Sequence, residues 1–193
     1  MFPHFDTRFA TMPRKAQADD EELTQSELEL YLMRHGSAGK PVGDTFGQDF
    51  RRPLTAEGAE KVRKIGAGLK RLGVKPDWIV TSPLVRSLQT ADILATILSP
   101  AFPVSTSDSL RPGCSAEGFV PHLADHPKRR KVLAVGHEPD LSQLAARLIG
   151  SDAVARFSLK KGGCCLISLS EVPPTSFGQL VWWVTPRILR GIS

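Results

Sequence analysis

Two histidines and two arginines stand where apolar runs of the chain end. Arg34 and His35 close the run LELYLMRHG, Arg86 follows DWIVTSP, and His137 follows KVLAVG. Arginine offers a fork of donors that matches phosphate oxygens. Histidine can act as a nucleophile or a proton donor near neutral pH. If the fold brings these four residues together, their side chains suit a phosphoryl group.

A metal centre is the alternative interpretation of two histidines. Zinc would need a third ligand, and two arginines beside it would be unfavourable. The three cysteines, Cys114, Cys164 and Cys165, lack the paired spacing of a zinc site or a disulfide framework. We therefore expect no metal and no cofactor, and a reducing, cytoplasmic location.

The elements that must position these residues alternate between strand and helix. Apolar runs of strand length predict strands at residues 28–34, 77–81, 103–106, 131–136, 164–169 and 179–184. Apolar spacings of three and four, with caps such as Thr55 and Ser82-Pro83, predict helices over 56–72, 83–98, 115–125 and 139–148. This order predicts a three-layer α/β/α domain over residues 28–193, with a mostly parallel central sheet and one antiparallel edge strand. Residues 1–27 are polar and mixed in charge, which indicates a flexible N-terminal extension.

In a parallel sheet, the carboxyl ends of the strands at 28–34, 77–81 and 131–136 lie at one edge, where ligands bind in open α/β folds. Adjacent Arg34 and His35 would point to opposite faces of a regular strand. Both can reach one crevice only if the backbone leaves strand geometry there, and Gly36 permits a sharp turn close to a ligand.

Composition narrows the classes of partner. A hydrophobic content of 41% and a charged content of 23% are typical of a soluble globular protein. No apolar run approaches the roughly 20 residues of a membrane span. The net charge of +5 suits an anionic substrate, and it also suits nucleic acid. The densest basic run, Lys128 to Lys131, holds no aromatic residue, so we interpret it as a solvated loop and expect no nucleic-acid or membrane partner.

Four stretches carry a resemblance to a known family. LMRHG, RPLTAEG, TSPLVRSLQTA and AVGHEP, in this order, resemble the histidine phosphatase (phosphoglycerate-mutase-like) superfamily and most of all its SixA-type phosphohistidine phosphatases. The resemblance covers about residues 28–185. It implies that His35 is the nucleophile, that Arg34 and Arg86 bind phosphate oxygens, and that His137 donates to the phosphoryl group, which it does best as a cation.

Further loop residues are candidates for substrate binding. Arg52, in the RPLT stretch, matches a position that can reach the same pocket, although a surface arginine is an equal interpretation. Gly36 and Ser37, and with them Lys40, are the remaining loop candidates. Gln89 and Thr90 are expected to serve in helix packing and polar contacts.

The chain departs from the family pattern where ester-cleaving relatives carry their proton donor. Relatives read RHG-x-S-x-x-N, whereas this chain has Ala38 and Pro41, and Pro112 stands at the position of their glutamate. An alkoxide leaving group needs a strong acid, whereas phosphohistidine leaves as imidazole and depends less on one. Possible replacement acids, each of which is also a typical surface or capping carboxylate, are Glu117, Asp108 and Glu138.

These observations lead to one main hypothesis and two alternatives. The main hypothesis is a metal-independent phosphatase that acts on phosphohistidine in a protein through a phospho-His35 intermediate. The alternatives are a phosphomonoesterase for a small metabolite or sugar phosphate, and a non-catalytic module that binds a phosphorylated ligand. The oligomeric state stays open, as does the place of Trp182 and Trp183 in the core, at an edge or at an interface.

Overall fold

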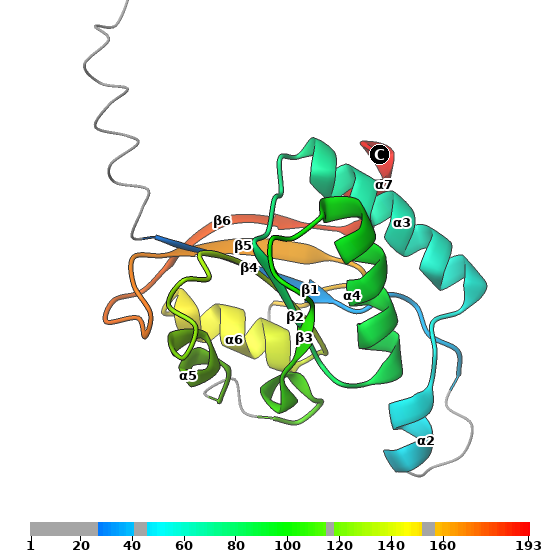
Figure 1. The fold of residues 1–193 in the computed structure, drawn as a ribbon, viewed down its shortest axis with the longest axis horizontal. Helices are drawn as coiled ribbons and strands as arrows, with labels where there is room; N and C mark the ends of the chain where they lie inside the picture. Colours follow the sequence, from blue (N-terminus) through cyan, green and yellow to red (C-terminus); the bar gives the residue numbers. More distant parts are fainter. Residues whose placement is uncertain (1–26, 41–45, 115–117, 152–156) are drawn as a thin grey trace, which may run out of the picture.

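A sheet with the strand order β3-β2-β4-β1-β5-β6 forms the centre of the computed structural model (Figure 1). The model describes residues 27–40, 46–114, 118–151 and 157–193. Its strands are β1 (Leu28–Arg34), β2 (Trp78–Thr81), β3 (Ser105–Thr106), β4 (Lys131–Gly136), β5 (Cys164–Leu169) and β6 (Gln179–Val184). The mostly parallel α/β fold predicted from the sequence is confirmed.

The direction of the last two strands refines that prediction. β3, β2, β4 and β1 are parallel neighbours, β5 pairs antiparallel with β1, and β6 pairs antiparallel with β5. The strand that runs against the others is therefore β5, and its antiparallel pairing with the edge strand β6 is the one predicted for the two late strands. A short connection between β5 and β6 forces these two strands to be antiparallel neighbours, so β6 runs with the parallel strands again.

Helices cover both faces of the sheet, as Figure 1 shows. Along β1, Leu30 and Leu32 face the side of α5 (Phe119–Ala124) and α6 (Asp140–Leu148), whereas Tyr31 and Met33 face the other side. That second side carries α3 (Ala56–Arg71), α4 (Val85–Leu98) and α7 (Pro186–Gly191). Alternate side chains of a strand point to opposite faces, so β1 contributes to two cores and is buried along most of its length.

Three short elements are not predicted by the pattern of apolar residues in the sequence. They are α2 (Phe46–Arg51), the 3₁₀ turn η1 (Asp108–Leu110) and α7. Each spans fewer than two helical turns, too little for a 3.6-residue period to be visible. The expected helix over 115–125 is shorter, at Phe119–Ala124, and residues 115–117 lie outside the described part. The expected extension over 1–27 also lies outside it, apart from Glu27.

The loop after β1 packs directly on the first turn of α3. Thr55 caps this helix as predicted, because its hydroxyl oxygen accepts from the Gly58 N–H at 2.9 Å. A Cβ added to Gly58 would lie 2.0 Å from the carbonyl oxygen of Ser37, and one added to Gly36 would lie 2.5 Å from Val62 Cγ2. Gly36 is not among the glycines with positive φ. Glycine is therefore required at position 36 by close packing, and not by the sharp turn that the sequence predicted.

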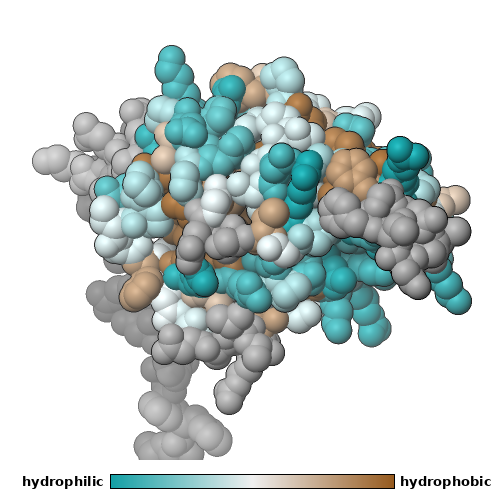
Figure 2. All heavy atoms as spheres, turned by 90° about the horizontal axis from the view of Figure 1, so that it is seen from below, coloured by the Kyte–Doolittle hydropathy of each residue, from teal (hydrophilic) through white to brown (hydrophobic). Residues whose placement is uncertain are grey.

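The tryptophan pair of β6 belongs to the core on both faces. Trp182 lies 5.9 Å from Tyr31 between ring centroids, and Trp183 lies 5.4 Å from Phe157. The two rings pack against the two separate core clusters. On the face drawn in Figure 2, apolar residues form separate patches among hydrophilic ones. Within the described ranges, no helix has both the length and the apolar character that crossing a bilayer requires.

Candidate active site

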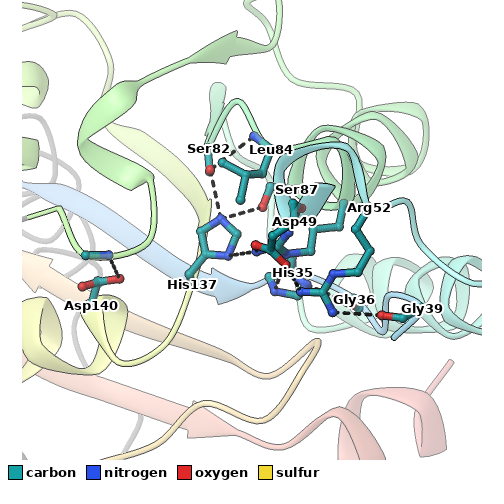
Figure 3. Close-up of polar contacts among 12 residues, drawn as sticks. His35, Gly36, Gly39, Asp49, Arg52, Ser82, Leu84, Ser87, His137 and Asp140 are labelled. Atoms are coloured by element: carbon teal, nitrogen blue, oxygen red, sulfur yellow. Dashed lines mark hydrogen bonds and ion pairs between the residues drawn. The ribbon is translucent and has the colours of Figure 1, made fainter. Parts of the chain in front are cut away.

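The carboxyl ends of β1, β2 and β4 meet at one edge of the sheet. Arg34 is in register with Gly136, and Thr81 is in register with Val135. The residues that follow these strands therefore emerge side by side. The His35 N–H donates to Gly136 O at 3.1 Å, and the rings of His35 and His137 lie 4.9 Å apart between centroids. Figure 3 shows both histidines converging on one cluster of polar side chains.

His35 is buried and held in one tautomer. Its Nδ1 lies 2.7 Å from the carbonyl oxygen of Gly36, which can only accept, so Nδ1 carries the proton. Nε2 is left with a lone pair and accepts from Arg86 Nε at 3.2 Å. Burial lowers the pKa of His35 to about 3; the Gly36 hydrogen bond opposes this shift, and the charges of Arg86 and Arg34 add to it. His35 is therefore neutral at pH 7, and the lone pair of its ring is on Nε2.

Arg86 lies at the centre of the cluster, with 4% of its side chain exposed. It stands in the first turn of α4, and besides His35 it contacts His137 Nδ1 through Nη2 at 3.4 Å. Thr90 ties this turn of α4 to β1, because its hydroxyl donates to Arg86 O and accepts from the Gly36 N–H at 3.0 Å. Gln89 accepts from the Leu54 N–H. Both side chains thus have the packing and polar roles predicted for them.

His137 is neutral in this arrangement. Nδ1 faces a guanidinium, which only donates, so the proton is on Nε2 and reaches Ser82 Oγ at 2.9 Å, with Ser87 Oγ at 3.3 Å. Burial lowers the pKa of His137 to about 2, and the nearby His35 and Arg86 contribute to the shift. The sequence predicted a cationic His137, whereas the buried side chain is neutral here. A phosphoryl group beside Nδ1 would favour the protonated form again.

Arg34 and Arg52 border the same cluster. Arg34 donates from Nη1 to Leu159 O at 3.0 Å, and Arg52 donates from Nη1 to Gly39 O at 2.9 Å. Among the described residues, the buried Nε of each has no hydrogen-bond partner. Unused buried donors of this kind are suited to an anion. Arg52 is joined to the cluster by its ion pair with Asp49 at 2.6 Å and has 18% of its side chain exposed, and its part in substrate binding stays a prediction.

Asp49 is the member of the cluster that the sequence argument missed. This residue of α2 accepts from Arg86 Nη2 at 2.9 Å and from Arg52 Nη2 at 2.6 Å. Burial acts to raise the pKa of its carboxyl, but the two guanidinium groups outweigh burial and hold the pKa below its ordinary value. The sequence did contain a signal: Asp49 precedes Arg52 by three residues, which is the spacing of neighbours on one helical face.

The remaining loop candidates are engaged in backbone contacts. Gly36 gives its N–H to Thr90 and its carbonyl to His35, and the carbonyl of Ser37 accepts from the Thr55 N–H at 3.1 Å. Lys40 is exposed. Gly36 and Ser37 thus order the loop beside His35, and these backbone groups are already occupied.

The candidate replacement acids have structural partners. Asp108 pairs with Arg111 at 2.9 Å and has 75% of its side chain exposed. Glu138 accepts from the Ser142 hydroxyl and from the Leu159 N–H at 2.9 Å. Glu117 lies outside the described residues. The two that are described therefore act as surface and capping carboxylates. Across the described residues, no three side chains of His, Cys, Asp or Glu are grouped to hold a metal ion.

The two buried histidines predict a loss of stability in mild acid. Both folded-state pKa values lie below the value of about 6.5 of an unfolded chain. Below pH 6.5 the unfolded state therefore binds more protons, and the free energy of unfolding falls by up to about 1.4 kcal/mol per pH unit for each histidine. Urea unfolding between pH 8 and 5 measures this slope. The His137→Gln variant should lose less stability with falling pH than the wild type, and the two profiles should be parallel above pH 7.5. Parallel profiles down to pH 5 would contradict the prediction.

Comparison with known proteins agrees with this geometry. Residues 30–112 match the model of the histidine phosphatase superfamily (branch 1). An uncharacterized protein of Picosynechococcus sp. is 33% identical over 138 residues, which cover 70% of this chain and 82% of that protein. The phosphohistidine phosphatase SixA of Escherichia coli is 25% identical over 166 residues, covering 84% of this chain and 97% of SixA.

Solved structures show the same fold. The protein histidine phosphatase SixA complexed with tungstate superimposes with a TM-score of 0.72 at 22% identity, over 84% of this chain and 99% of SixA. A putative alpha-ribazole-5'-P phosphatase from Escherichia coli gives a TM-score of 0.65 at 22% identity, over 82% of this chain and 98% of that chain. Sequence, fold and strand-edge cluster agree: the chain belongs to the histidine phosphatase superfamily, and among its members it is similar to SixA.

Proposed function

We propose that the protein hydrolyses phosphohistidine on another protein through a covalent phospho-His35 intermediate. His35 is the nucleophile in this proposal. Its Nδ1–H donates to Gly36 O at 2.7 Å, which orients the ring and leaves the attacking lone pair on Nε2. The neutral state of the ring at pH 7 means that no proton has to be removed before the attack.

The reaction proceeds in two displacements. In the first, Nε2 of His35 attacks phosphorus in line, the P–N bond of the substrate breaks, and neutral imidazole leaves if its other ring nitrogen carries a proton. In the second, water attacks phospho-His35, the P–Nε2 bond breaks, and inorganic phosphate leaves. The net change is hydrolysis of one P–N bond: the protonated phosphoimidazole and water give neutral imidazole and H₂PO₄⁻, and both protons of the water end on the phosphate.

Arg34, Arg86 and Arg52 bind the phosphoryl oxygens in this proposal. Their charges are fixed by the fold before substrate arrives, so little reorganisation accompanies the build-up of charge in the transition state. His137 contributes through Nδ1, which faces the cluster and takes up a proton when the anion is bound. Its opposite nitrogen is held by Ser82 at 2.9 Å.

The choice of a P–N bond over a P–O bond rests on the protonation and the contacts of the carboxylates near the site. Asp49 touches the arginines of the cluster, and its pKa is lowered, so it holds no proton to donate at pH 7. Asp108 and Glu138 have partners of their own. Pro112 stands where ester-cleaving relatives carry glutamate. Among the described residues, no carboxylic acid is placed to protonate an alkoxide leaving group, whereas imidazole needs no acid of comparable strength.

A substrate displayed on a protein is supported by the connections around the site. Residues 99–104 link α4 to β3 directly, with no inserted segment that would cover a small metabolite. The relative from Escherichia coli that the chain matches over most of its length is named as a phosphohistidine phosphatase.

A substrate panel tests the proposal. Phosphohistidine on a carrier protein, sugar phosphates and a chromogenic phosphate ester are assayed for phosphate release with and without EDTA. We expect the highest kcat/KM on the phosphohistidine protein, unchanged by EDTA. High efficiency on a sugar phosphate with none on phosphohistidine would support the phosphomonoesterase instead. Binding without release of product from any substrate would support a binding module.

A further inference from the structure

The carboxylate of Asp49 lies where a phosphoryl group would be expected to bind. Its Oδ2 accepts from Arg86 at 2.9 Å and its Oδ1 accepts from Arg52 at 2.6 Å, so the two oxygens are shared between two guanidinium groups. The backbone carbonyl of Asp49 also accepts from Arg86 Nη1 at 2.8 Å. Two oxygens on two guanidinium forks is the pattern in which arginines bind phosphate. Figure 3 shows Asp49 in the same group of labelled side chains as His35, His137 and Arg52.

These contacts occupy the donors that a substrate would need. Arg86 directs Nε to His35 and both terminal nitrogens to Asp49, and its side chain is 4% exposed. The lone pair of His35 Nε2 therefore faces an N–H of Arg86 and not an open space. A phosphorus atom in line with Nε2 can bring its oxygens to Arg86 only if these hydrogen bonds are exchanged for new ones.

The element that carries Asp49 is suited to being displaced. α2 is six residues long and makes no sheet pairing. Its described contacts with the rest of the protein include the Asp49 ion pairs, the hydrogen bond from Arg86 to the Asp49 carbonyl, and Phe50, whose ring lies 6.0 Å from the Arg111 guanidinium. The side chain of Asp49 is 33% exposed, so water can replace the arginines around it. A short helix outside the sheet can move at a lower cost than a strand whose backbone is paired with its neighbours.

We propose that Asp49 is a built-in competitor, which fills the phosphoryl site in the resting enzyme and is displaced when the substrate binds. This inference rests on the proposed function, because the displacing group is the phosphoryl group of the substrate. Displacement frees the terminal nitrogens of Arg86 and Arg52 for phosphate oxygens. Arg86, released from Asp49, can then exchange its hydrogen bond with Nε2 of His35 for one with the phosphoryl group.

Asp49 could have a different role, in which it orders the two arginines for the substrate, and that role predicts the opposite effect on anion binding. If Asp49 only ordered the two arginines for the substrate, its removal would weaken anion binding. If Asp49 competes with the anion, its removal strengthens binding, because the apparent affinity is reduced by the fraction of molecules in which the site is filled.

Calorimetric titration of the full chain with sodium tungstate, a tetrahedral dianion, distinguishes the two roles. We expect Asp49→Asn to bind tungstate about tenfold more tightly than the wild type, as for the loss of one carboxylate shared by two guanidinium groups. Glu60→Gln is the matched control, because it removes one negative charge from an Arg63 pair of the same i,i+3 spacing on the exposed side of α3. It should bind like the wild type. Equal or weaker binding by Asp49→Asn would overturn the inference.

A second measurement uses the wild-type protein alone. The ¹³C signal of the Asp49 carboxyl, assigned by its absence from Asp49→Asn, should move on tungstate binding as its arginine contacts are lost. Tungstate binding without a change in this signal would overturn the inference and leave the proposed function intact. If the wild type neither binds tungstate nor hydrolyses any phosphorylated substrate, the proposed function fails, and this inference fails with it.

Discussion

Replacing His35 with asparagine is expected to lower kcat by about 10⁴-fold or more, as for the loss of the nucleophile in other covalent mechanisms. Asparagine can still donate from its side-chain amide to Gly36 O, so the loop after β1 keeps its hydrogen bond. It has no atom in the place of Nε2. The substitution therefore removes the nucleophile and retains the structural contact. The same variant should form no phosphoenzyme, whereas the wild-type adduct should be labile in acid and stable in base.

Rapid quenching with labelled substrate measures both the turnover and the adduct. His126→Asn is a matched control, because Nδ1 of His126 also bonds a backbone carbonyl, that of His122 at 2.9 Å, at the end of α5. That variant should keep nearly full activity. Substantial turnover by His35→Asn, or an adduct of the same chemical stability, would show that another residue is the nucleophile.

Arg86→Lys is expected to lower kcat/KM by about 10² to 10³-fold although it keeps the positive charge. Arg86 contacts His35 through Nε and His137 through Nη2, and its guanidinium fork is buried. A lysine has a single terminal nitrogen, which cannot reach both histidines and present two parallel donors to a phosphoryl group. Arg86→Ala should lose at least as much activity.

Steady-state kinetics on the preferred substrate of the panel measures this loss. Arg63→Lys, at an exposed position of α3, makes the same change away from the cluster and should be close to the wild type. Thermal unfolding of each variant separates loss of function from loss of folding. If Arg86→Lys keeps wild-type kcat/KM, the geometry of the fork has no part in the reaction and the charge alone is sufficient.

Local sequence signals explain why the cluster of residues at the carboxyl ends of the strands could be predicted. β1 and β4 begin and end at the residues that the apolar runs indicated, and Thr55 caps α3 as predicted. Parallel pairing of β1, β2 and β4 then follows from the alternation of strand and helix. It brings the residues after these strands together whatever the details of packing. This is why His35 and His137, 102 positions apart along the chain, could be expected in one crevice.

Properties that depend on long-range contacts could not be anticipated in the same way. The neutral state of His137 arises from its burial beside His35 and Arg86, and no local pattern reports burial. The direction of β5 depends on which neighbour it pairs with. α2 has too few residues to show a period, so the loop containing Asp49 looked irregular in the sequence.

The sequence by itself therefore determined which side chains reach the edge of the sheet, because strand ends and helix caps are set by neighbours a few residues away. Only the tertiary structure decided what those side chains do to one another. The contact of Arg86 with Asp49 joins residues 37 positions apart, and the contact of Arg86 with His35 joins residues 51 positions apart. Such contacts depend on how α2 and α4 pack against the end of β1. That packing determines which nitrogen of each histidine carries a proton and which anion fills the site.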